Sequence, residues 1–270
     1  MRLFIDSAKI EEIKAAKEMG CSGCTTNPTL IKEAVDELRR NGKDIDMEKY
    51  IKQICRTVGR GNPVSLEVIS LDFQKMVKEA KILWKKFNHV ENNVVIKVPV
   101  STVCGPIDVN FDGIRAIIEL EKIGIKTNAT LIMKPEQALL AQKASYISPF
   151  VGRIDDYIRD QLGISYKKSD YFLADGFDRA GIKFDDDGIV SGVDLIWKIM
   201  NIFRAQNLKS QIIAASIRNS RQLREVAETG APIATVPFYV IAEMFKHKKT
   251  IEGVLKFSKD TVEEYKDIFS

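Results

Sequence analysis

The sequence predicts a single α/β domain over residues 1–270, a (β/α)8 TIM barrel with one additional C-terminal helix. Eight short apolar segments alternate with helical patterns along the chain. These segments are rich in Val and Ile, as parallel strands covered by helices must be. The length of 270 residues, 45% of them hydrophobic, suffices for the core of one barrel. A doubly wound sheet is the alternative, but it often has a Gly-rich first turn, and no G-x-G-x-x-G occurs here.

Each expected strand is a short run in which apolar residues dominate. Each run is followed by a stretch with apolar residues at helical spacing, which is the pattern of a βα unit. The strands are expected at residues 2–6, 21–26, 63–69, 93–100, 125–132, 146–151, 211–216 and 232–237.

The expected helices follow from spacing and from capping residues. Ile10 and Ile13 recur at helical spacing after the first strand. Asn27-Pro28 and Pro135 mark the starts of two more helices, because Asn caps a helix N-terminus and Pro fits its first position. Further helical patterns are expected at residues 8–19, 72–87, 112–122, 193–205, 219–229 and 239–246.

An insertion is expected after the sixth strand, at residues 157–189. This stretch is longer than an ordinary connection between elements. It is charged and includes the run DDDG at residues 185–188, whose spacing does not fit an EF-hand loop. A solvated turn is therefore expected there.

A final amphipathic helix is expected at residues 251–269, with Ile251, Val254 and Leu255 on its apolar stripe. A barrel already has eight outer helices, so this ninth one covers something else. It either caps the N-terminal end of its own barrel or reaches a neighbouring subunit. Most soluble oligomers are symmetric, so a closed homo-oligomer is expected.

The charge pattern excludes several classes of protein. The 41 Lys and Arg nearly cancel the 37 Asp and Glu, and the net charge of +4 is too small and too scattered for nucleic-acid binding. The basic run KHKK at residues 246–249 is typical of a helix C-terminus. No stretch approaches the roughly 20 apolar residues of a membrane span. Asp6 interrupts the apolar N-terminus, so no signal peptide is expected and the location is expected to be cytoplasmic.

Cys21 and Cys24 form a C-x-x-C, which is also found in redox sites and in half of a metal site. No second C-x-x-C is present, and the two histidines, His89 and His247, lie far away in the sequence. Buried, unreactive thiols are therefore expected, and no metal site is expected.

Lys97 is the strongest single signal of chemistry. It lies inside the apolar run VVIKVPV, where a charged amine is costly to bury. Desolvation lowers the pKa of a lysine, and a neutral amine can form a Schiff base with a carbonyl. The alternative is a structural ion pair with Glu67 or Asp6. A barrel brings these two acids and the lysine to one mouth, and imine chemistry needs an amine together with a carboxylate that moves protons.

Other polar residues stand at the ends of the expected strands, where barrels place catalytic groups. Arginine recognises phosphate through its rigid fork of donors, and barrels often bind phosphate at the late strand ends. An anionic substrate is therefore expected. Besides Asp6 and Glu67, these residues are Asn128, Thr130, Ser148, Phe150, Arg153, Ser216 and Arg218.

At these positions the sequence resembles the transaldolase family, which includes the fructose 6-phosphate aldolases. The matching segments run in family order over most of the chain, and TTNP and SPFVGRI are the most specific of them. The segments are FIDS at 4–7, TTNPTLI at 25–31, VIKVP at 95–99, NATLI at 128–132, SPFVGRID at 148–155 and AASIRN at 214–219.

The resemblance implies Schiff-base chemistry without a metal or other cofactor. Lys97 matches the imine-forming lysine, and Asp6 matches the general acid/base. Glu67 and Thr130 match the pair that holds a catalytic water. The dihydroxyacetone part would be held by Asn27, Asn128 and Ser148, and the phosphate by Arg153, Ser216 and Arg218.

Two positions separate the branches of the family. The aldolase branch has Gln at the position of Glu67 and Tyr at that of Phe150, so a transaldolase acting on fructose 6-phosphate or sedoheptulose 7-phosphate is expected. The alternatives are a fructose 6-phosphate aldolase, a transaldolase for another anionic ketose such as a sulfo-sugar, and a barrel that binds sugar phosphates without turning them over. Extra residues at 100–106 and 157–189 set the chain apart from the compact members.

Overall fold

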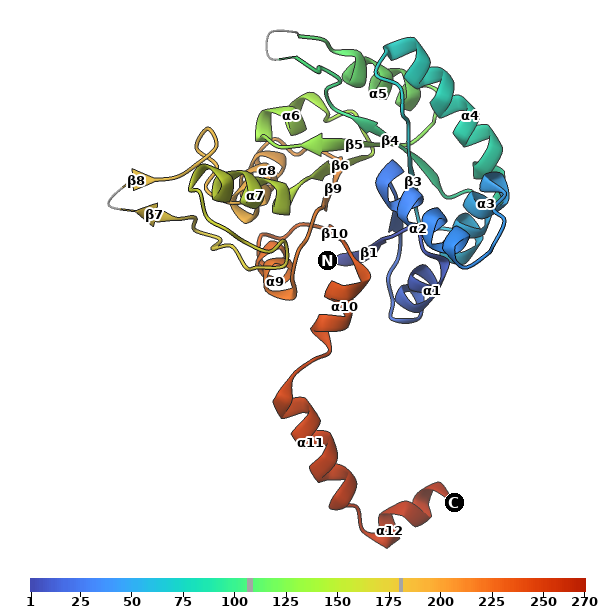
Figure 1. Ribbon diagram of the computed structural model, residues 1–270, viewed down its shortest axis with the longest axis vertical. Helices are drawn as coiled ribbons and strands as arrows, with labels where there is room; N and C mark the ends of the chain where they lie inside the picture. Colours follow the sequence, from blue (N-terminus) through green and yellow to red (C-terminus); the bar gives the residue numbers. More distant parts are fainter. Residues whose placement is uncertain (106–108, 180–181) are drawn as a thin grey trace.

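The computed structural model describes residues 1–105, 109–179 and 182–270. The predicted (β/α)8 barrel is confirmed: eight parallel strands close on themselves in the order β1-β10-β9-β6-β5-β4-β3-β2 (Figure 1). The strands are β1 Arg2–Asp6, β2 Cys24–Thr25, β3 Val64–Glu67, β4 Val94–Pro99, β5 Thr127–Ile132, β6 Tyr146–Pro149, β9 Gln211–Ala214 and β10 Ile233–Val236.

Every expected strand segment contains an observed strand, but most of the observed strands are shorter. Ladder hydrogen bonds continue past some of these ends: the Val68 amide donates to Lys97 O at 3.1 Å, and the Thr26 amide to Ser65 O at 3.1 Å. The chain then leaves the ladder at the mouth of the barrel. Most of the predicted polar residues therefore lie in the C-terminal half of a strand or beyond its end. Asn128 is an exception, because it is the second residue of β5.

The helices form the outer ring of the barrel (Figure 1). The Asn27 side chain accepts a hydrogen bond from the Leu30 amide at 3.0 Å, and Pro28 is the first residue of the next helix, as predicted. Pro135 also begins a helix as predicted. The helices are α1 Ile10–Glu18, α2 Pro28–Arg40, α3 Met47–Val58, α4 Phe73–Glu91, α5 Asp112–Lys122, α6 Pro135–Leu140, α7 Val151–Gln161, α8 Gly192–Ala205, α9 Ser220–Glu228 and α10 Phe238–Met244.

The barrel interior changes from apolar to polar along the strands. Phe4, Ile213 and Ile233 form a separate buried cluster inside the barrel. Two residues further along β1 and β10, on the same face of each strand, stand Asp6 and Thr235. The main core lies between the strands and the helices. Along β1 and β10 the side chains on this face therefore become polar toward the C-terminal mouth.

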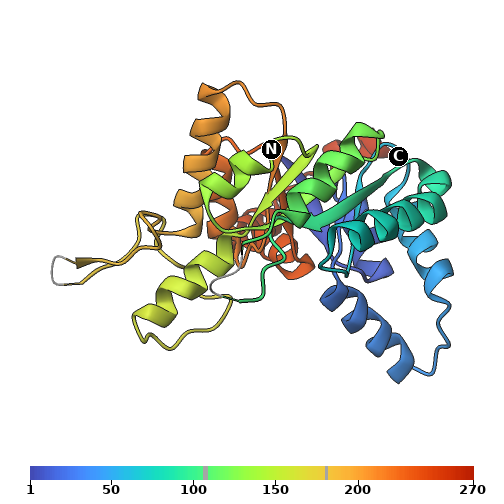
Figure 2. The ribbon, with the colours of Figure 1, turned by 90° about the horizontal axis from the view of Figure 1, so that it is seen from above.

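The expected insertion begins later than predicted. Residues 157–161 belong to α7, because Val151, Ile154 and Ile158 are buried at helical spacing and continue the helix. The extra segment follows at 162–191 and includes the hairpin β7 Asp178–Arg179 and β8 Ile182–Lys183, which projects from the barrel (Figure 2). The expected turn is present: Gly188 donates to Asp185 Oδ1 at 2.7 Å. Residues 180–181 of the insertion and residue 106 of the stretch 100–106 lie outside the described residues.

The C-terminal segment is interrupted where the sequence predicts one continuous helix. It is α11 Lys248–Lys259, followed by α12 Glu263–Lys266 and a final 3-10 turn. The break comes at Asp260 and Thr261, whose hydroxyl donates back to Phe257 O at 3.0 Å. No residue of α11 or α12 is buried, and the segment extends away from the barrel (Figure 1). It does not cap the N-terminal end of its own barrel.

The described helices include none with the length and apolarity that crossing a membrane requires.

Candidate active site

A cleft of about 420 Å³ opens at the C-terminal mouth of the barrel. Side chains from most of the strand ends converge on it, as the barrel topology dictates. Two predicted site residues, Asn128 and Thr130, are fully buried and do not line the cleft directly. The predicted residues that do line it are Asp6, Asn27, Glu67, Lys97, Ser148, Phe150, Arg153, Ser216 and Arg218.

Lys97 lies in the depth of this cleft. Its side chain is 6% exposed, and its Nζ lies 3.0 Å from Glu67 Oε2. The register places Glu67 of β3 directly opposite Lys97 of β4, so the pair follows from the strand pairing. Nζ also donates to Thr26 O at 3.3 Å and lies 6.0 Å from the centre of the Phe150 ring. Glu67 thus offsets the cost of burying the ammonium and is the nearest acceptor for its proton.

Asp6 ends β1 on the other side of the cleft. Burial raises the pKa of this carboxyl, and the positive charge of Lys97 and a hydrogen bond from Thr25 partly offset that effect. The Thr25 hydroxyl lies 2.6 Å from Asp6 Oδ1 and 2.6 Å from the Thr235 hydroxyl. A carboxyl with a raised pKa in a cleft is suited to take and return a proton.

A polar network lies beneath the cleft. Asn128 Nδ2 donates to Ser65 Oγ at 3.2 Å, and its Oδ1 accepts from Ser148 Oγ at 2.8 Å. Both ends of the Asn128 amide are therefore oriented, and Ser148 connects it to the cleft. The buried Thr130 hydroxyl has no hydrogen-bond partner within the part of the chain that the structure describes, so it is free to bind a water or a substrate oxygen.

The cleft is also lined by the three residues of the predicted anion site, Arg153, Ser216 and Arg218. Arg218 Nη2 lies 2.9 Å from Asp156 Oδ2, so an acid partly neutralises its charge. Arg153 lies on the face of the Phe150 ring, with its guanidinium 5.1 Å from the ring centre. A Cβ on Gly152 would stand 2.4 Å from Ser216 O and 2.4 Å from Arg218 Nε. Only glycine allows the start of α7 to approach this loop so closely.

The sequence also matches known proteins over nearly its whole length. The family described as transaldolase/fructose-6-phosphate aldolase matches residues 3–269. The chain belongs to this family. A probable transaldolase of Carboxydothermus hydrogenoformans is 39% identical over 96% of this chain and 97% of its own length. A probable transaldolase of Clostridium tetani is 40% identical over the same shares, and one of Clostridioides difficile is 38% identical over 96% of each chain. The expected enzyme with transaldolase activity is confirmed.

The cysteines of this transaldolase family member are free thiols. Cys21 and Cys24 are both buried, and Cys24 Sγ donates to Ser7 O at 3.2 Å. Burial raises the pKa of both thiols, which makes them poor nucleophiles and poor metal ligands. Within the described ranges no three His, Cys, Asp or Glu side chains come together as a metal site requires.

Sequence reasoning missed several residues that line the cleft, and four of them are informative. Thr25 and Thr235 stand on the inward faces of their strands, a signal that alternation along the strands could have given. Leu131 lines the cleft with φ +59° at an irregularity of β5, which no residue pattern marks. Lys168 comes from the extra segment after α7, and nothing in a loop sequence shows which cleft it reaches.

Asp155 holds the backbone next to the anion site. It accepts hydrogen bonds from the Gly192 amide at 2.7 Å and from Gln222 Nε2. Gln222 Oε1 in turn accepts from the Arg218 amide at 2.8 Å. Burial raises the pKa of Asp155 to about 7, against the opposing effects of these hydrogen bonds and of Arg159.

The raised pKa of Asp155 predicts a pH-dependent stability. The folded-state pKa of about 7 lies above the ordinary value of 3.8, so the folded protein retains a proton that the unfolded chain releases between these values. The resulting stabilisation is complete below the ordinary value and is lost as the pH rises through the folded one. The free energy of unfolding of the wild type, minus that of Asp155→Asn, is expected to fall by about 1.4 kcal/mol per pH unit across this window. Urea titrations at a series of pH values measure this difference, and a constant difference would contradict the prediction.

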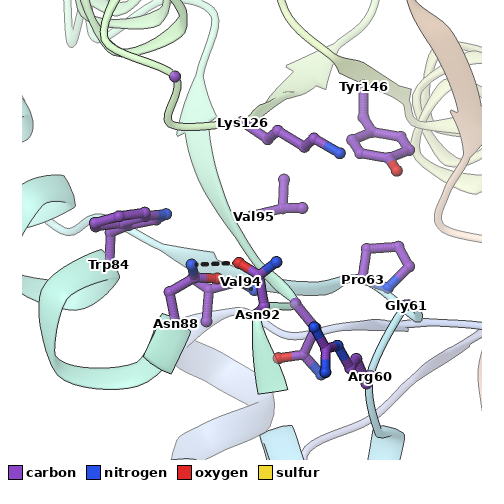
Figure 3. Close-up of a pocket in the computed structure, with 12 residues that line it drawn as sticks. Arg60, Gly61, Pro63, Trp84, Asn88, Asn92, Val94, Val95, Lys126 and Tyr146 are labelled. Carbon is purple, nitrogen blue, oxygen red and sulfur yellow. Dashed lines mark hydrogen bonds between the residues drawn. The ribbon is translucent and has the colours of Figure 1, made fainter. Parts of the chain in front are cut away.

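A second cavity, of about 360 Å³, lies at the opposite end of the barrel (Figure 3). It is lined by residues at the starts of the strands, such as Val94 and Tyr146, and by Arg60, Trp84 and Lys126. None of the predicted site residues lines it. The N-terminal end of a barrel serves stability rather than catalysis, so the C-terminal cleft is the candidate active site.

Proposed function

We propose that the protein transfers a dihydroxyacetone unit from fructose 6-phosphate or sedoheptulose 7-phosphate to an aldose phosphate, through a Schiff base on Lys97. The observation that carries this proposal is the buried amine of Lys97, 3.0 Å from Glu67 in the cleft that Asp6 also lines. A barrel that only bound sugar phosphates would not need an amine buried beside two acids.

In the proposed route the Lys97 amine, after giving up a proton, attacks C2 of the ketose. Loss of water then gives an iminium. Asp6 takes the proton of the C4 hydroxyl, and the C3–C4 bond breaks to release an aldose phosphate. The bonding electrons pass into the iminium and leave an enamine on Lys97. The enamine carbon attacks the acceptor aldehyde while Asp6 returns the proton, and water hydrolyses the new imine. Because the iminium is the electron sink, the route needs neither metal nor cofactor.

The remaining residues have binding roles in this proposal. The Thr130 hydroxyl and Glu67 hold the water of imine formation and hydrolysis, which the unpartnered Thr130 Oγ1 supports. Ser148 and the oriented Asn128 amide, with Asn27, hold the hydroxyls of the dihydroxyacetone part. The phosphate is held by Arg153, Ser216 and Arg218.

Borohydride reduction tests the covalent step. In the presence of fructose 6-phosphate, reduction is expected to add a reduced three-carbon unit to the peptide that contains Lys97, detected by mass spectrometry. Reduction without the sugar is the control. An unmodified Lys97, or the adduct on another lysine, would overturn the proposal.

The alternative activity is release of free dihydroxyacetone, as an aldolase. The ring of Phe150, with its centre 6.0 Å from Lys97 Nζ, carries no hydroxyl that could help to protonate the enamine. We therefore retain transfer of the dihydroxyacetone unit as the proposed activity. Sustained release of dihydroxyacetone from fructose 6-phosphate without an acceptor would replace it by the aldolase. One guanidinium fork can bind either a phosphate or a sulfonate. Rates measured with a panel of anionic ketoses, including a sulfo-sugar, would show which head group the enzyme prefers.

We also propose that the C-terminal segment docks on a neighbouring copy in a closed homo-oligomer. Its support is the exposed apolar surface of α11 and α12, which includes Ile251, Leu255, Phe257 and Tyr265. Truncation after Lys246 is expected to reduce the mass measured by light scattering to that of a monomer while the barrel stays folded. The proposal would be contradicted if the truncated chain folded and formed an oligomer of the same order as the full-length chain, or if the full-length chain were a monomer.

A cytoplasmic location completes the proposal. It is supported by the four cysteines, all of them free thiols, since disulfides form and persist in oxidising compartments.

A further inference from the structure

The segment between α7 and α8 brings a lysine to the catalytic cleft. Lys168 lines the same cavity as Arg153, Ser216 and Arg218, although it belongs to none of the barrel strands or helices. Within the described residues its ammonium has no carboxylate within 4.0 Å. It is therefore an exposed cation at the edge of the cleft, with no carboxylate partner among the described residues.

The backbone next to Lys168 is tied to the anion site. Arg159 Nη2 donates to Asp170 O at 2.7 Å, and the Lys167 amide donates to Asp170 Oδ2 at 2.8 Å. Asn219, the residue after Arg218, donates its side-chain amide to Ser169 O at 3.2 Å. These bonds hold the turn that carries Lys168 against the loop that carries Arg218.

Aromatic packing fixes the same turn from both sides. The guanidinium of Arg159 lies 4.8 Å from the centre of the Tyr166 ring and 5.1 Å from that of Phe172, which is buried. Tyr171 donates to Glu225 of α9 at 2.7 Å, and Arg221 lies over its ring. The turn is thus anchored to α7 and to α9, which fixes the position of the Lys168 backbone at the cleft.

The charge balance of the anion site leaves a role for this lysine. A phosphate monoester carries a charge of about −1.5 to −2 at neutral pH. Arg153 and Arg218 supply two positive charges, but Asp156, which lies 2.9 Å from Arg218 and 3.9 Å from Arg159, offsets part of the charge of Arg218. Arg153 and Arg218 therefore leave a dianion only partly neutralised. Lys168 lines the same cleft as a further cation, whereas the charge of Lys97 is paired with Glu67.

We propose that Lys168 is a specificity-determining residue that selects dianionic ketose and aldose phosphates by supplying the third cation of the anion site. This inference rests on the proposed function, because it assumes that the cleft takes phosphorylated sugars. Lys168 does not touch the reacting carbons. Its loss should therefore weaken binding of the phosphate and leave the chemical step unchanged.

The test compares two neighbouring lysines. Lys168→Met removes the charge and keeps the apolar stem, and Lys167→Met makes the same change at a side chain that does not line the cleft. Lys168→Met is expected to raise KM for fructose 6-phosphate about 5-fold at low salt, with kcat unchanged and with no effect on unphosphorylated fructose. Lys167→Met should leave all constants unchanged, and Lys168→Arg should restore KM. The difference between the two lysines should shrink in high salt.

Calorimetry with inorganic phosphate gives a measurement that does not need turnover. Phosphate should bind the wild type and Lys167→Met equally and should bind Lys168→Met about 5-fold more weakly. Equal phosphate affinity of the two Met variants, or an equal effect of Lys168→Met on phosphorylated and unphosphorylated sugars, would overturn the inference. A separate result would show that the proposed function is wrong: the wild-type protein would form no adduct on Lys97 after borohydride reduction with fructose 6-phosphate.

Discussion

Replacement of Lys97 by Met is expected to lower kcat by at least about 10⁴-fold, because removal of the covalent nucleophile of an enzyme typically costs that much or more. Met fills the apolar part of the lysine's space but cannot form an imine. It also leaves Glu67 without the ammonium 3.0 Å away, so some loss of stability is expected as well. A coupled assay of aldose phosphate release measures the activity, and thermal unfolding measures the stability.

Two matched variants separate these effects. Lys97→Arg retains a positive charge for Glu67, but a guanidinium stays protonated and forms no imine, so it should be folded and inactive. Lys126→Met removes a lysine from the cavity at the other end of the barrel (Figure 3) and should leave activity unchanged. Turnover in Lys97→Arg above a few per cent of the wild-type rate would exclude Lys97 as the Schiff-base residue.

The strands and their polar ends could be predicted because both signals are local. The apolar run around Lys97 predicts a strand, and the same few residues contain the charged side chain that an apolar strand would not be expected to carry. Asn27 followed by Pro28 is a helix start whatever the rest of the chain does, and the structure shows the cap hydrogen bond at 3.0 Å. Once the number of strands indicates a barrel, its topology places polar residues near the strand ends at the same mouth.

What could not be predicted depends on contacts between distant segments. Residues 157–161 continue a helix because Val151, Ile154 and Ile158 pack against the rest of the barrel, while their charged neighbours suggested a loop. The pairing of Arg218 with Asp156 joins residues 62 apart in the sequence and changes the charge of the anion site. Lys168 reaches the cleft only because Asn219 and Arg159 hold its turn. The spacing of apolar residues along the sequence does not indicate such contacts.

The end of the chain shows the same limit. The apolar stripe at residues 251–269 predicts one helix, because the spacing of Ile251, Val254 and Leu255 does not reveal the break after Lys259. Nor does it reveal that the segment extends away from its own barrel, with no residue of α11 or α12 buried (Figure 1). Amphipathicity predicts that a surface will be covered and leaves the covering partner open.

Replacement of Asp6 by Asn is expected to lower kcat by about 10²- to 10⁴-fold, the usual contribution of a general acid/base. The change keeps the shape of the side chain and an oxygen that can accept the hydrogen bond from Thr25, which lies 2.6 Å from Asp6 Oδ1. It removes the base for the C4 hydroxyl and leaves the Lys97 amine intact. Borohydride with dihydroxyacetone should therefore still trap an adduct on Lys97 in this variant, while cleavage of fructose 6-phosphate is slow.

The pH dependence of kcat distinguishes a catalytic role of Asp6 from a purely structural one. Burial raises the pKa of Asp6, so the acidic limb of kcat in the wild type should lie above the ordinary value for an aspartate. Below that limb the carboxyl is protonated and cannot accept the C4 proton. The residual activity of Asp6→Asn should lack the limb. Asp187→Asn, which changes an exposed acid on the turn after the hairpin, should keep both the rate and the limb. If Asp6→Asn were slow but retained the acidic limb, another group would be the acid that titrates, and Asp6 would only hold Thr25 and the mouth of the barrel in place.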